Sequence, residues 1–342
     1  MENRQILLAE RPHGDLSEST TTLVTTPRPE CGEGEALIKV AMLSIDPTIR
    51  TWMDDAPGYL PPIQLGDVIR GSGVGVVVES KNDHYKVGDF VFGMTGWQEW
   101  VLATNESRFS VIPSGLGLGL DLATVMNVLG VTGITGYFGM TDVGQVKDGD
   151  VVVVSGAAGA TGSVAGQIAK ARGARVIGIA GGAQKCAEVV DAYGFDECLD
   201  YREDHLRTRL RETCLKGVDL YFDNVGGEIL DAVLTNLALH ARVVLCGAIS
   251  QYNVKGPRRG IENTSMLIVR RARMEGFLVL DYEKRFAEAQ GALATMVLSG
   301  ELKHHEHVVL GLERAPEALG LLFSGGNHGK TLVAVDETLQ LG

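Results

Sequence analysis

The chain has 342 residues, with 31 Lys and Arg against 43 Asp and Glu, and a formal net charge of −12. This balance argues against nucleic-acid binding, which usually needs a basic surface. Hydrophobic residues make up 45% of the chain, enough for a packed core and too many for a disordered protein. The apolar runs are too short to span a membrane, and Met1–Arg11 lacks the apolar centre of a secretory signal. We therefore expect a cytoplasmic protein that binds neither nucleic acid nor membranes.

The first part of the chain, residues 1–125, is predicted to be a β-rich domain. Short apolar runs separated by glycine-rich turns are typical of a distorted barrel or sandwich. Glycines inside residues 69–78 predict a bulge or the close approach of another backbone. The expected strands are Ala36–Ser44, Ile69–Val78, Phe90–Gly93 and Gly96–Ala103.

Residues 126–305 alternate short apolar strands with helical segments, which is the pattern of a parallel sheet with helices on both faces. The predicted fold class is therefore α/β, with a doubly wound Rossmann sheet. Residues 306–342 return to strand and turn, so the parallel sheet is expected to be inserted into the β-rich domain. The expected strands are Val151–Ser155, Val176–Ala180, Glu197–Asp200, Leu220–Phe222, Arg242–Cys246 and Gly276–Leu280, and the expected helices are Ser163–Arg172, Gln184–Tyr193, His205–Cys214 and Arg285–Ser299.

A glycine-rich turn follows the first of these strands and precedes the first helix. Its glycines are Gly156, Gly159 and Gly162, with small residues between them. Such a turn lets backbone N–H groups approach a pyrophosphate at the N-terminus of a helix, and the strand before and helix after are the context that a dinucleotide site requires. The alternative is a turn that only packs the helix on the sheet.

The end of the second strand indicates which dinucleotide binds. NAD-specific sites usually carry Asp or Glu there to hold the ribose 2′-hydroxyl. Here Val176–Ala180 is followed by Gly181, Gly182 and Ala183, and then by Lys185. A cation and open space suit a 2′-phosphate, so NADPH is favoured. The alternative is that Lys185 is a solvated charge at a helix start, a position where the helix dipole disfavours it.

Several further motifs resemble one family. They are similar to the zinc-independent double-bond reductases of the medium-chain dehydrogenase/reductase superfamily, which include leukotriene hydroxydehydrogenase/15-oxoprostaglandin 13-reductases, alkenal reductases and curcumin reductases. The likeness runs from about Leu37 to Val335. The motifs that carry it are GAAGATGSVAGQIAK (Gly156–Lys170), GGAQKC (Gly181–Cys186), DNVGG (Asp223–Gly227), CGAISQYN (Cys246–Asn253) and GNHGKT (Gly326–Thr331).

The resemblance implies a GroES-like substrate domain that carries a Rossmann NADP-binding domain, and a homodimer formed near Arg270–Leu280. It also implies a cofactor site. The pyrophosphate would lie at Gly159, Ala160, Thr161 and Gly162; the 2′-phosphate at Lys185, Tyr201 and Asn327; the ribose and nicotinamide at Asn224, Cys246, Gly247, Ala248, Ile249, Ser250, Tyr252, Phe277, Leu278 and Val279.

The implied activity is NADP-dependent 2-alkenal/enone reduction (EC 1.3.1-type), in which hydride from NADPH goes to the β-carbon of an α,β-unsaturated ketone or aldehyde. Tyr252 matches the tyrosine near the substrate carbonyl and is the candidate hydrogen-bond donor to the developing enolate. A tyrosine that merely caps a turn is the alternative for this residue. Quinone reduction with the same cofactor and a non-catalytic NADPH-binding protein are the alternative functions.

Two features bear on the substrate and on metal use. Thr48 stands where the family usually has a tyrosine, and this position is expected to border the substrate, as is Tyr252. Residues 66–75, GDVIRGSGVG, contain neither His nor Cys, and no cysteine-rich lobe is visible. The ligands that zinc-dependent relatives use are therefore missing, and we expect no metal.

Overall fold

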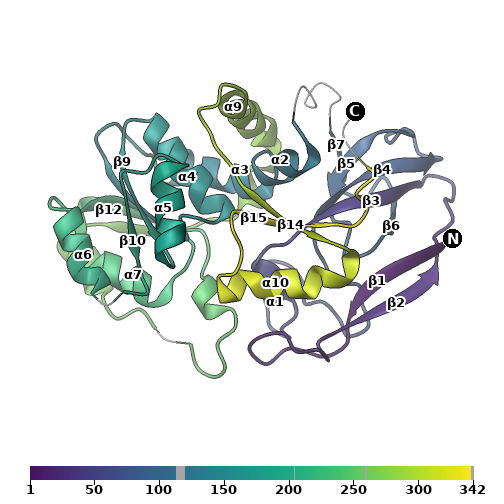
Figure 1. Cartoon of the computed structure of the whole chain (residues 1–342), viewed down its shortest axis with the longest axis horizontal. Coiled ribbons are helices and arrows are strands. Elements are labelled where there is room, and N and C mark those ends of the chain that lie inside the picture. The colour runs from purple at the N-terminus through teal and green to yellow at the C-terminus, as the bar shows by residue number, and fades with distance from the viewer. Residues whose placement is uncertain (113–119, 204, 259, 340–342) are drawn as a thin grey trace. The chain divides into compact units, whose positions relative to one another are not determined.

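The structure is a computed structural model that describes residues 1–112, 120–203, 205–258 and 260–339. The chain divides into two compact units (Figure 1). The first unit combines Met1–Met126 with Glu306–Asn327 and Thr331–Gly342, and the second combines Asn127–His305 with His328–Lys330.

The first unit is built on antiparallel sheets. A seven-stranded sheet has the order β14-β15-β3-β4-β5-β7, with β6 also paired to β3, and β1 and β2 form a separate pair. The strands are β1 (Glu2–Leu8), β2 (Thr21–Pro27), β3 (Ala36–Ser44), β4 (Gly73–Ser80), β5 (Phe90–Gly93), β6 (Trp100–Ala103), β7 (Ser110–Val111), β14 (Glu306–Leu310) and β15 (Lys330–Ala334); the helices are α1 (Thr48–Trp52), α2 (Leu122–Asn127), a 3-10 turn at Leu312–Arg314, and α10 (Ala315–Ser324).

The glycines of β4 lie where the sequence predicts a close backbone approach. A Cβ on Gly75 would lie 3.1 Å from the carbonyl carbon of Lys39 in the neighbouring strand β3. A larger residue would therefore push these strands apart, which explains why β-branched residues alternate with glycine here.

The second unit contains a parallel sheet of six strands within the described residues. Its order is β10-β9-β8-β11-β12-β13, with every neighbouring pair parallel. The chain therefore moves outward from β8 to one edge, returns, and continues from β11 to the other edge, which is the doubly wound Rossmann order. The strands are β8 (Val151–Ser155), β9 (Arg175–Ala180), β10 (Glu197–Asp200), β11 (Val218–Asp223), β12 (Leu237–Leu245) and β13 (Arg273–Gly276).

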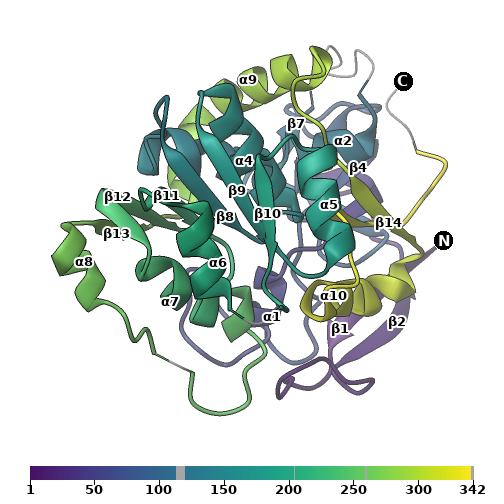
Figure 2. The ribbon, with the colours of Figure 1, turned by 60° about the vertical axis from the view of Figure 1, so that its left-hand side comes forward.

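Helices cover both faces of this sheet (Figure 2). On one face, Leu210 and Val233 pack with Val153, Ile177 and Tyr221 in one buried cluster. On the other face, α4 and α5 lie beside β8 and β9. The helices are α3 (Val131–Phe138) with a π-helical turn at Gly139–Val143, α4 (Ala160–Ala171), α5 (Ala183–Asp191), α6 (Leu206–Thr213), α7 (Gly227–Leu234), α8 (Ser265–Arg270) and α9 (Phe286–Leu298), with 3-10 turns at Ile249–Gln251 and Val279–Arg285.

The α/β fold class, with a parallel Rossmann-like sheet and a separate antiparallel sheet, is confirmed. One predicted strand is wrong: the sequence placed it at residues 276–280, whereas β13 is Arg273–Gly276. The apolar run that suggested the strand leads instead into a 3-10 turn, and its Leu278 and Leu280 are exposed. Helix α4 begins at Ala160 rather than Ser163, so Ala160–Gly162 form its first turn.

None of the helices in the described part of the chain combines the length and the hydropathy needed to cross a bilayer.

Candidate functional site

Most of the predicted site residues follow the carboxyl ends of the parallel strands. Residues 159–162 follow β8, Lys185 follows β9, Tyr201 follows β10, Asn224 follows β11, residues 246–252 follow β12, and residues 277–279 follow β13. These ends lie at one edge of the sheet. Because β8 and β11 are neighbours from which the chain winds in opposite directions, the order reverses between them, and ligands of such folds bind at this point.

The glycine-rich turn places the start of α4 against the end of β8. Gly159 is the N-cap of α4, and a Cβ on Gly162 would lie 2.9 Å from the carbonyl carbon of Gly156. Only glycine therefore allows the first helical turn to pack this closely on the strand. The first N–H groups of a helix have no partner inside it, and here they belong to Ala160, Thr161 and Gly162. Gly159 also forms a parallel bridge with Gly329, which brings the segment at residues 328–330 beside the loop.

A cluster of positive charge surrounds the turn after β9. Gly182 has φ +96°, a conformation that glycine adopts easily, and it is the N-cap of α5. Lys185 is half-buried in the first turn of α5. A Cβ on Gly181 would lie 3.0 Å from Arg202 Nε and 3.1 Å from the Tyr201 hydroxyl. Lys185, Tyr201 and Arg202 are therefore brought to one turn.

The electrostatics of this cluster favour an anion. Burial lowers the pKa of the Lys185 ammonium below its usual value, and repulsion from Arg202 lowers it further, with Glu188 acting in the opposite direction. The Asp200 carboxylate, at the end of β10, accepts backbone N–H groups of Gly182 at 2.9 Å and Arg202 at 3.0 Å. It thus fixes the turn to which both cations belong.

The turn after β11 is organised by the buried carboxyl of Asp223. One oxygen, Oδ1, accepts the hydroxyls of Tyr221 at 2.7 Å and Ser155 at 3.0 Å and the N–H groups of Val225 and Gly226. Burial raises the pKa of Asp223, and these hydrogen bonds oppose that rise. Asn224, beside it, donates from Nδ2 to the Ser155 carbonyl at 2.7 Å, so its side chain lies over the glycine-rich turn.

The segment at residues 246–252 rests on this turn. Its Cys246 and Gly247 N–H groups donate to the Asp223 carbonyl at 2.9 and 3.0 Å, and Ser250 Oγ donates to the Val225 carbonyl at 2.6 Å. The N–H of Ala248 donates to the Tyr252 hydroxyl at 3.1 Å, so the phenol folds back on its own turn. Burial raises the pKa of the Cys246 thiol to about 12, which keeps it a neutral side chain.

The residues after β13 follow the edge strand of the sheet. The Phe277 ring packs toward α3, because a Cβ on Gly139 would lie 2.8 Å from Phe277 Cζ. Leu278 is exposed, and Val279 packs with Ile134 and Phe138.

Two predicted residues belong to the first unit. Thr48 starts α1, and its hydroxyl shares a 2.7 Å hydrogen bond with the Tyr59 hydroxyl. Asn327 ends its segment of the first unit and directly precedes His328 in the chain; the His328 ring contacts Glu188 of α5 at 3.4 Å.

Three functional candidates were not predicted from the sequence. Arg202 follows Tyr201 directly, so its position after a strand end was a usable signal. Asp223 was quoted only as part of a motif, and its role emerges only from its four donors. Tyr59 lies 11 residues after Thr48, and nothing in the sequence links the two hydroxyls that meet.

The structure also bears on metal binding. Among the residues it describes, His, Cys, Asp and Glu side chains nowhere gather in threes or more in a way that could hold an ion.

Comparison with known proteins decides the family. Residues 4–111 match the N-terminal domain of oxidoreductase family, and residues 160–296 match the zinc-binding dehydrogenase family. The chain is 37% identical to the NADPH-dependent curcumin reductase of Escherichia coli (strain K12) and 37% identical to the NADP(+)-dependent 2-alkenal reductase of Nicotiana tabacum. Each alignment covers 97% of both chains. The chain belongs to the zinc-independent reductases of the medium-chain dehydrogenase/reductase superfamily.

The fold of this reductase is that of a solved relative. The crystal structure of CurA from Vibrio vulnificus in complex with NADPH is similar with a TM-score of 0.91 and 38% identity, covering 98% of this chain and 99% of that one. The family suggested by the motifs is thereby confirmed.

Proposed function

We propose that this reductase catalyses the NADPH-dependent reduction of the carbon–carbon double bond of α,β-unsaturated ketones and aldehydes. The observation that carries the proposal is the docking of the Tyr252 turn on the Asp223–Val225 turn, beside a glycine-rich phosphate loop. Two of the similar proteins, named an NADPH-dependent curcumin reductase and an NADP(+)-dependent 2-alkenal reductase, support the proposal.

The residues at the strand ends fit NADPH. Backbone N–H groups at the start of α4 suit a pyrophosphate, and Gly159–Gly162 leave room for it. Asn224 and Cys246–Ser250 would hold the ribose and nicotinamide, with Phe277–Val279 beyond them. When bound, NADPH supplies the hydride. These residues orient it and exclude water.

Lys185, Tyr201, Asn327 and the additional Arg202 would bind the 2′-phosphate. Lys185 and Arg202 repel each other in the unliganded protein, so a ligand that carries two negative charges stabilises this pair of cations most. The 2′-phosphate of NADPH is such a group, with a charge near −2 at neutral pH. NADH lacks it, so the cluster provides the discrimination between the two cofactors.

Tyr252 would stabilise the charge that develops on the substrate carbonyl oxygen. Its hydroxyl oxygen already accepts the Ala248 N–H, and an accepted hydrogen bond polarises the O–H and strengthens it as a donor. The substrate α-carbon can take its proton from water, so no further acid is required. We keep Thr48 as a proposed substrate contact, and Tyr59, which is bonded to it, joins it as a candidate.

A homodimer and a cytoplasmic location complete the proposal. β13 is an edge strand that pairs only with β12 within the described residues, and unpaired edges are sites of strand addition. Close to it in the chain, Ile268 and Val269 of α8 are 80% and 58% exposed. Pairing of two β13 edges across a two-fold axis would cover such apolar residues. The five cysteines are all free thiols, which suits a reducing compartment.

The activity is tested directly with a simple enone. The enzyme with NADPH should convert 3-nonen-2-one to 2-nonanone. The formation of 2-nonanone is measured by chromatography of the products. The saturated ketone is the control and should not be consumed. Reduction of the carbonyl to an allylic alcohol, or turnover of quinones but not enones, would contradict the proposal and favour an alcohol dehydrogenase or the quinone reductase alternative.

Changing the cation cluster should alter cofactor preference. A charge-assisted hydrogen bond contributes about 1.5–3 kcal/mol, so Lys185→Ala should raise the Kd for NADPH by roughly 10–100-fold. Arg202→Gln, at an exposed position, should raise it by up to about fivefold. The Kd for NADH should change little in either variant. Arg207→Gln, an exposed arginine of α6, is the matched control. Equal weakening of NADPH and NADH would remove both residues from 2′-phosphate recognition.

Tyr252→Phe should lower kcat on enones while leaving the Kd for NADPH nearly unchanged. The hydrogen bond strengthens as charge builds on the carbonyl oxygen, and only that increment raises kcat. Loss of one donor from an oxyanion site costs on the order of 10²–10³-fold. We expect about tenfold or more here, because water or a ribose hydroxyl can substitute in part. The measurements are kcat and KM on one enone and the cofactor Kd by fluorescence; an unchanged kcat would exclude the residue from the mechanism.

A charge in the exposed apolar patch of α8 should disrupt the dimer. Light scattering should give the wild-type enzyme twice the mass of one chain, and Ile268→Glu should move it to the mass of the monomer. Leu215→Glu is the matched control, because Leu215 is 87% exposed and lies after α6, away from β13 in the strand order. A dimer that survives Ile268→Glu but not Leu215→Glu would place the interface elsewhere.

A further inference from the structure

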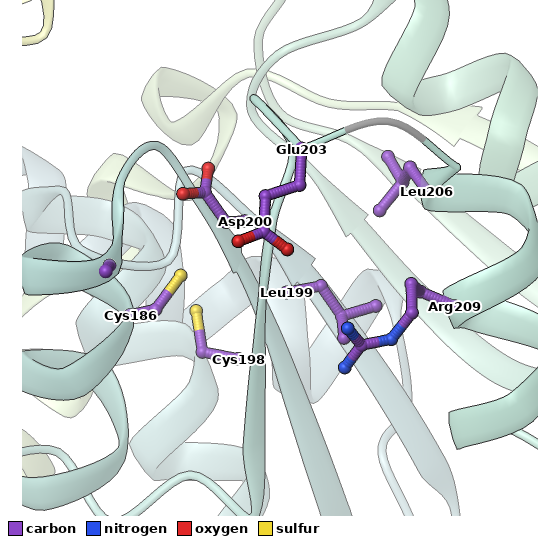
Figure 3. A pocket seen from close by; sticks show the side chains of 8 residues that line it. Cys186, Cys198, Leu199, Asp200, Glu203, Leu206 and Arg209 are labelled. Carbon is purple, nitrogen blue, oxygen red and sulfur yellow. The ribbon is translucent and has the colours of Figure 1, made fainter.

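A small cavity lies at the outer edge of the parallel sheet, where α5, β10 and α6 meet (Figure 3). Its volume is about 220 Å³. The side chains that line it include Cys186, Cys198, Asp200, Glu203, Leu206 and Arg209. None of these belongs to the set that we assign to NADPH.

Two thiols converge in this cavity from different elements. Cys186 lies in α5 and Cys198 in β10, and the Cys198 sulfur points toward the Cys186 sulfur (Figure 3). The two thiols influence each other: Cys198 lowers the pKa of Cys186, whereas Cys186 raises the pKa of Cys198. Both side chains are partly exposed. Cys198 is also held from the side, since a Cβ on Gly178 in β9 would lie 3.2 Å from its sulfur.

We propose that Cys186 and Cys198 form a reversible dithiol site, which hydrogen peroxide closes to an intramolecular disulfide. One thiol attacks the peroxide, the O–O bond breaks, and a sulfenic acid and water form. The second thiol then attacks the sulfenic sulfur and releases a second water. In total, two thiols lose two protons and two electrons, and the peroxide is reduced to two waters.

The environment favours a stable dithiol in reducing solution. Burial raises the pKa of both thiols, so they are protonated at neutral pH and attack slowly. The second step is intramolecular, because both thiols line the same cavity, and this makes the disulfide the expected product once the first thiol has reacted.

The site is linked through the chain to the cation cluster, and this part of the inference rests on the proposed function. Lys185 directly precedes Cys186, and Asp200, two residues after Cys198, holds the N–H groups of Gly182 and Arg202. A disulfide has an S–S distance of about 2.05 Å, much shorter than a thiol contact. Closing it draws the start of α5 toward β10, so Lys185 and the Gly181–Gly182 turn shift relative to Arg202. The disulfide should weaken NADPH binding more than NADH binding.

The test uses the full-length enzyme, reduced and then treated with hydrogen peroxide. Intact mass should fall by two hydrogen atoms, and peptide mapping without reductant should join Cys186 to Cys198. Cys186→Ser and Cys198→Ser should each abolish the link, while Cys214→Ser, a buried cysteine outside the cavity, should retain it. Folding of each variant is checked by circular dichroism. A link between other cysteines, or none, would overturn the site.

Cofactor binding gives the second readout. The Kd for NADPH should rise about tenfold on oxidation, the size of one lost charge-assisted contact, and should recover with dithiothreitol. Neither serine variant should show this rise. A mapped disulfide with an unchanged Kd would overturn the coupling to the cofactor. A reduced wild-type enzyme that binds NADPH and NADH equally would refute the proposed cofactor choice instead, and the mapped link would still stand.

Discussion

The candidate site depends on one buried carboxyl group. Asp223 joins the ends of three neighbouring strands: its Oδ1 accepts Ser155 of β8, Tyr221 of β11 and the N–H groups of the following turn, and its carbonyl accepts the turn after β12. Its other oxygen, Oδ2, is buried without a hydrogen-bond partner in the described structure. A buried polar oxygen that lacks a partner is costly, and removing the group would leave four donors unsatisfied. The fold keeps this unfavourable free energy at the end of β11, beside β8, where the winding direction of the chain reverses.

The sequence predicted the centre of the parallel sheet better than its edges. β8 and the glycine-rich turn were predicted correctly because a fully apolar strand followed by small residues has few other solutions. At the edge, β13 consists of Arg, Met, Glu and Gly, and carries no hydrophobic pattern, whereas the apolar residues that follow it attracted the strand prediction. Leu278 and Leu280 are exposed, so burial of their side chains does not hold this segment in a strand conformation. The sequence of β2 is polar and half-exposed, and α7 begins with a glycine, so neither segment carries a clear hydrophobic pattern or helix-start motif.

The candidate site residues also divide into those that the sequence predicts and those that only the fold reveals. Lys185 could be named from the loop that follows the second strand, whereas Tyr201 and Tyr252 could be named only through the resemblance to a known family. Arg202 was not predicted although its place after a strand end was a usable signal, and its guanidinium is seen beside Gly181 only in the fold. The Thr48–Tyr59 contact and the Cys186–Cys198 pair connect residues that are 11 and 12 positions apart. Single-sequence patterns report spacing along one element, and these contacts join different elements, so only the fold defines them.

Affinity and selectivity for the dinucleotide reside in different kinds of groups. The pyrophosphate would be bound by backbone N–H groups at the start of α4, which only substitution by proline removes, and a helix dipole contributes about 0.3–1 kcal/mol to such an anion. That contribution is the same for NADH and NADPH. Side-chain contacts to the 2′-phosphate contribute about 1.5–3 kcal/mol each and act on NADPH alone. On a chain of net charge −12, the long-range field opposes any anionic ligand, so local cations must overcome it. In the proposed site, the cofactor preference would therefore rest on two or three exchangeable side chains around Gly181 and Gly182, while the capacity to bind a dinucleotide at all would rest on the backbone.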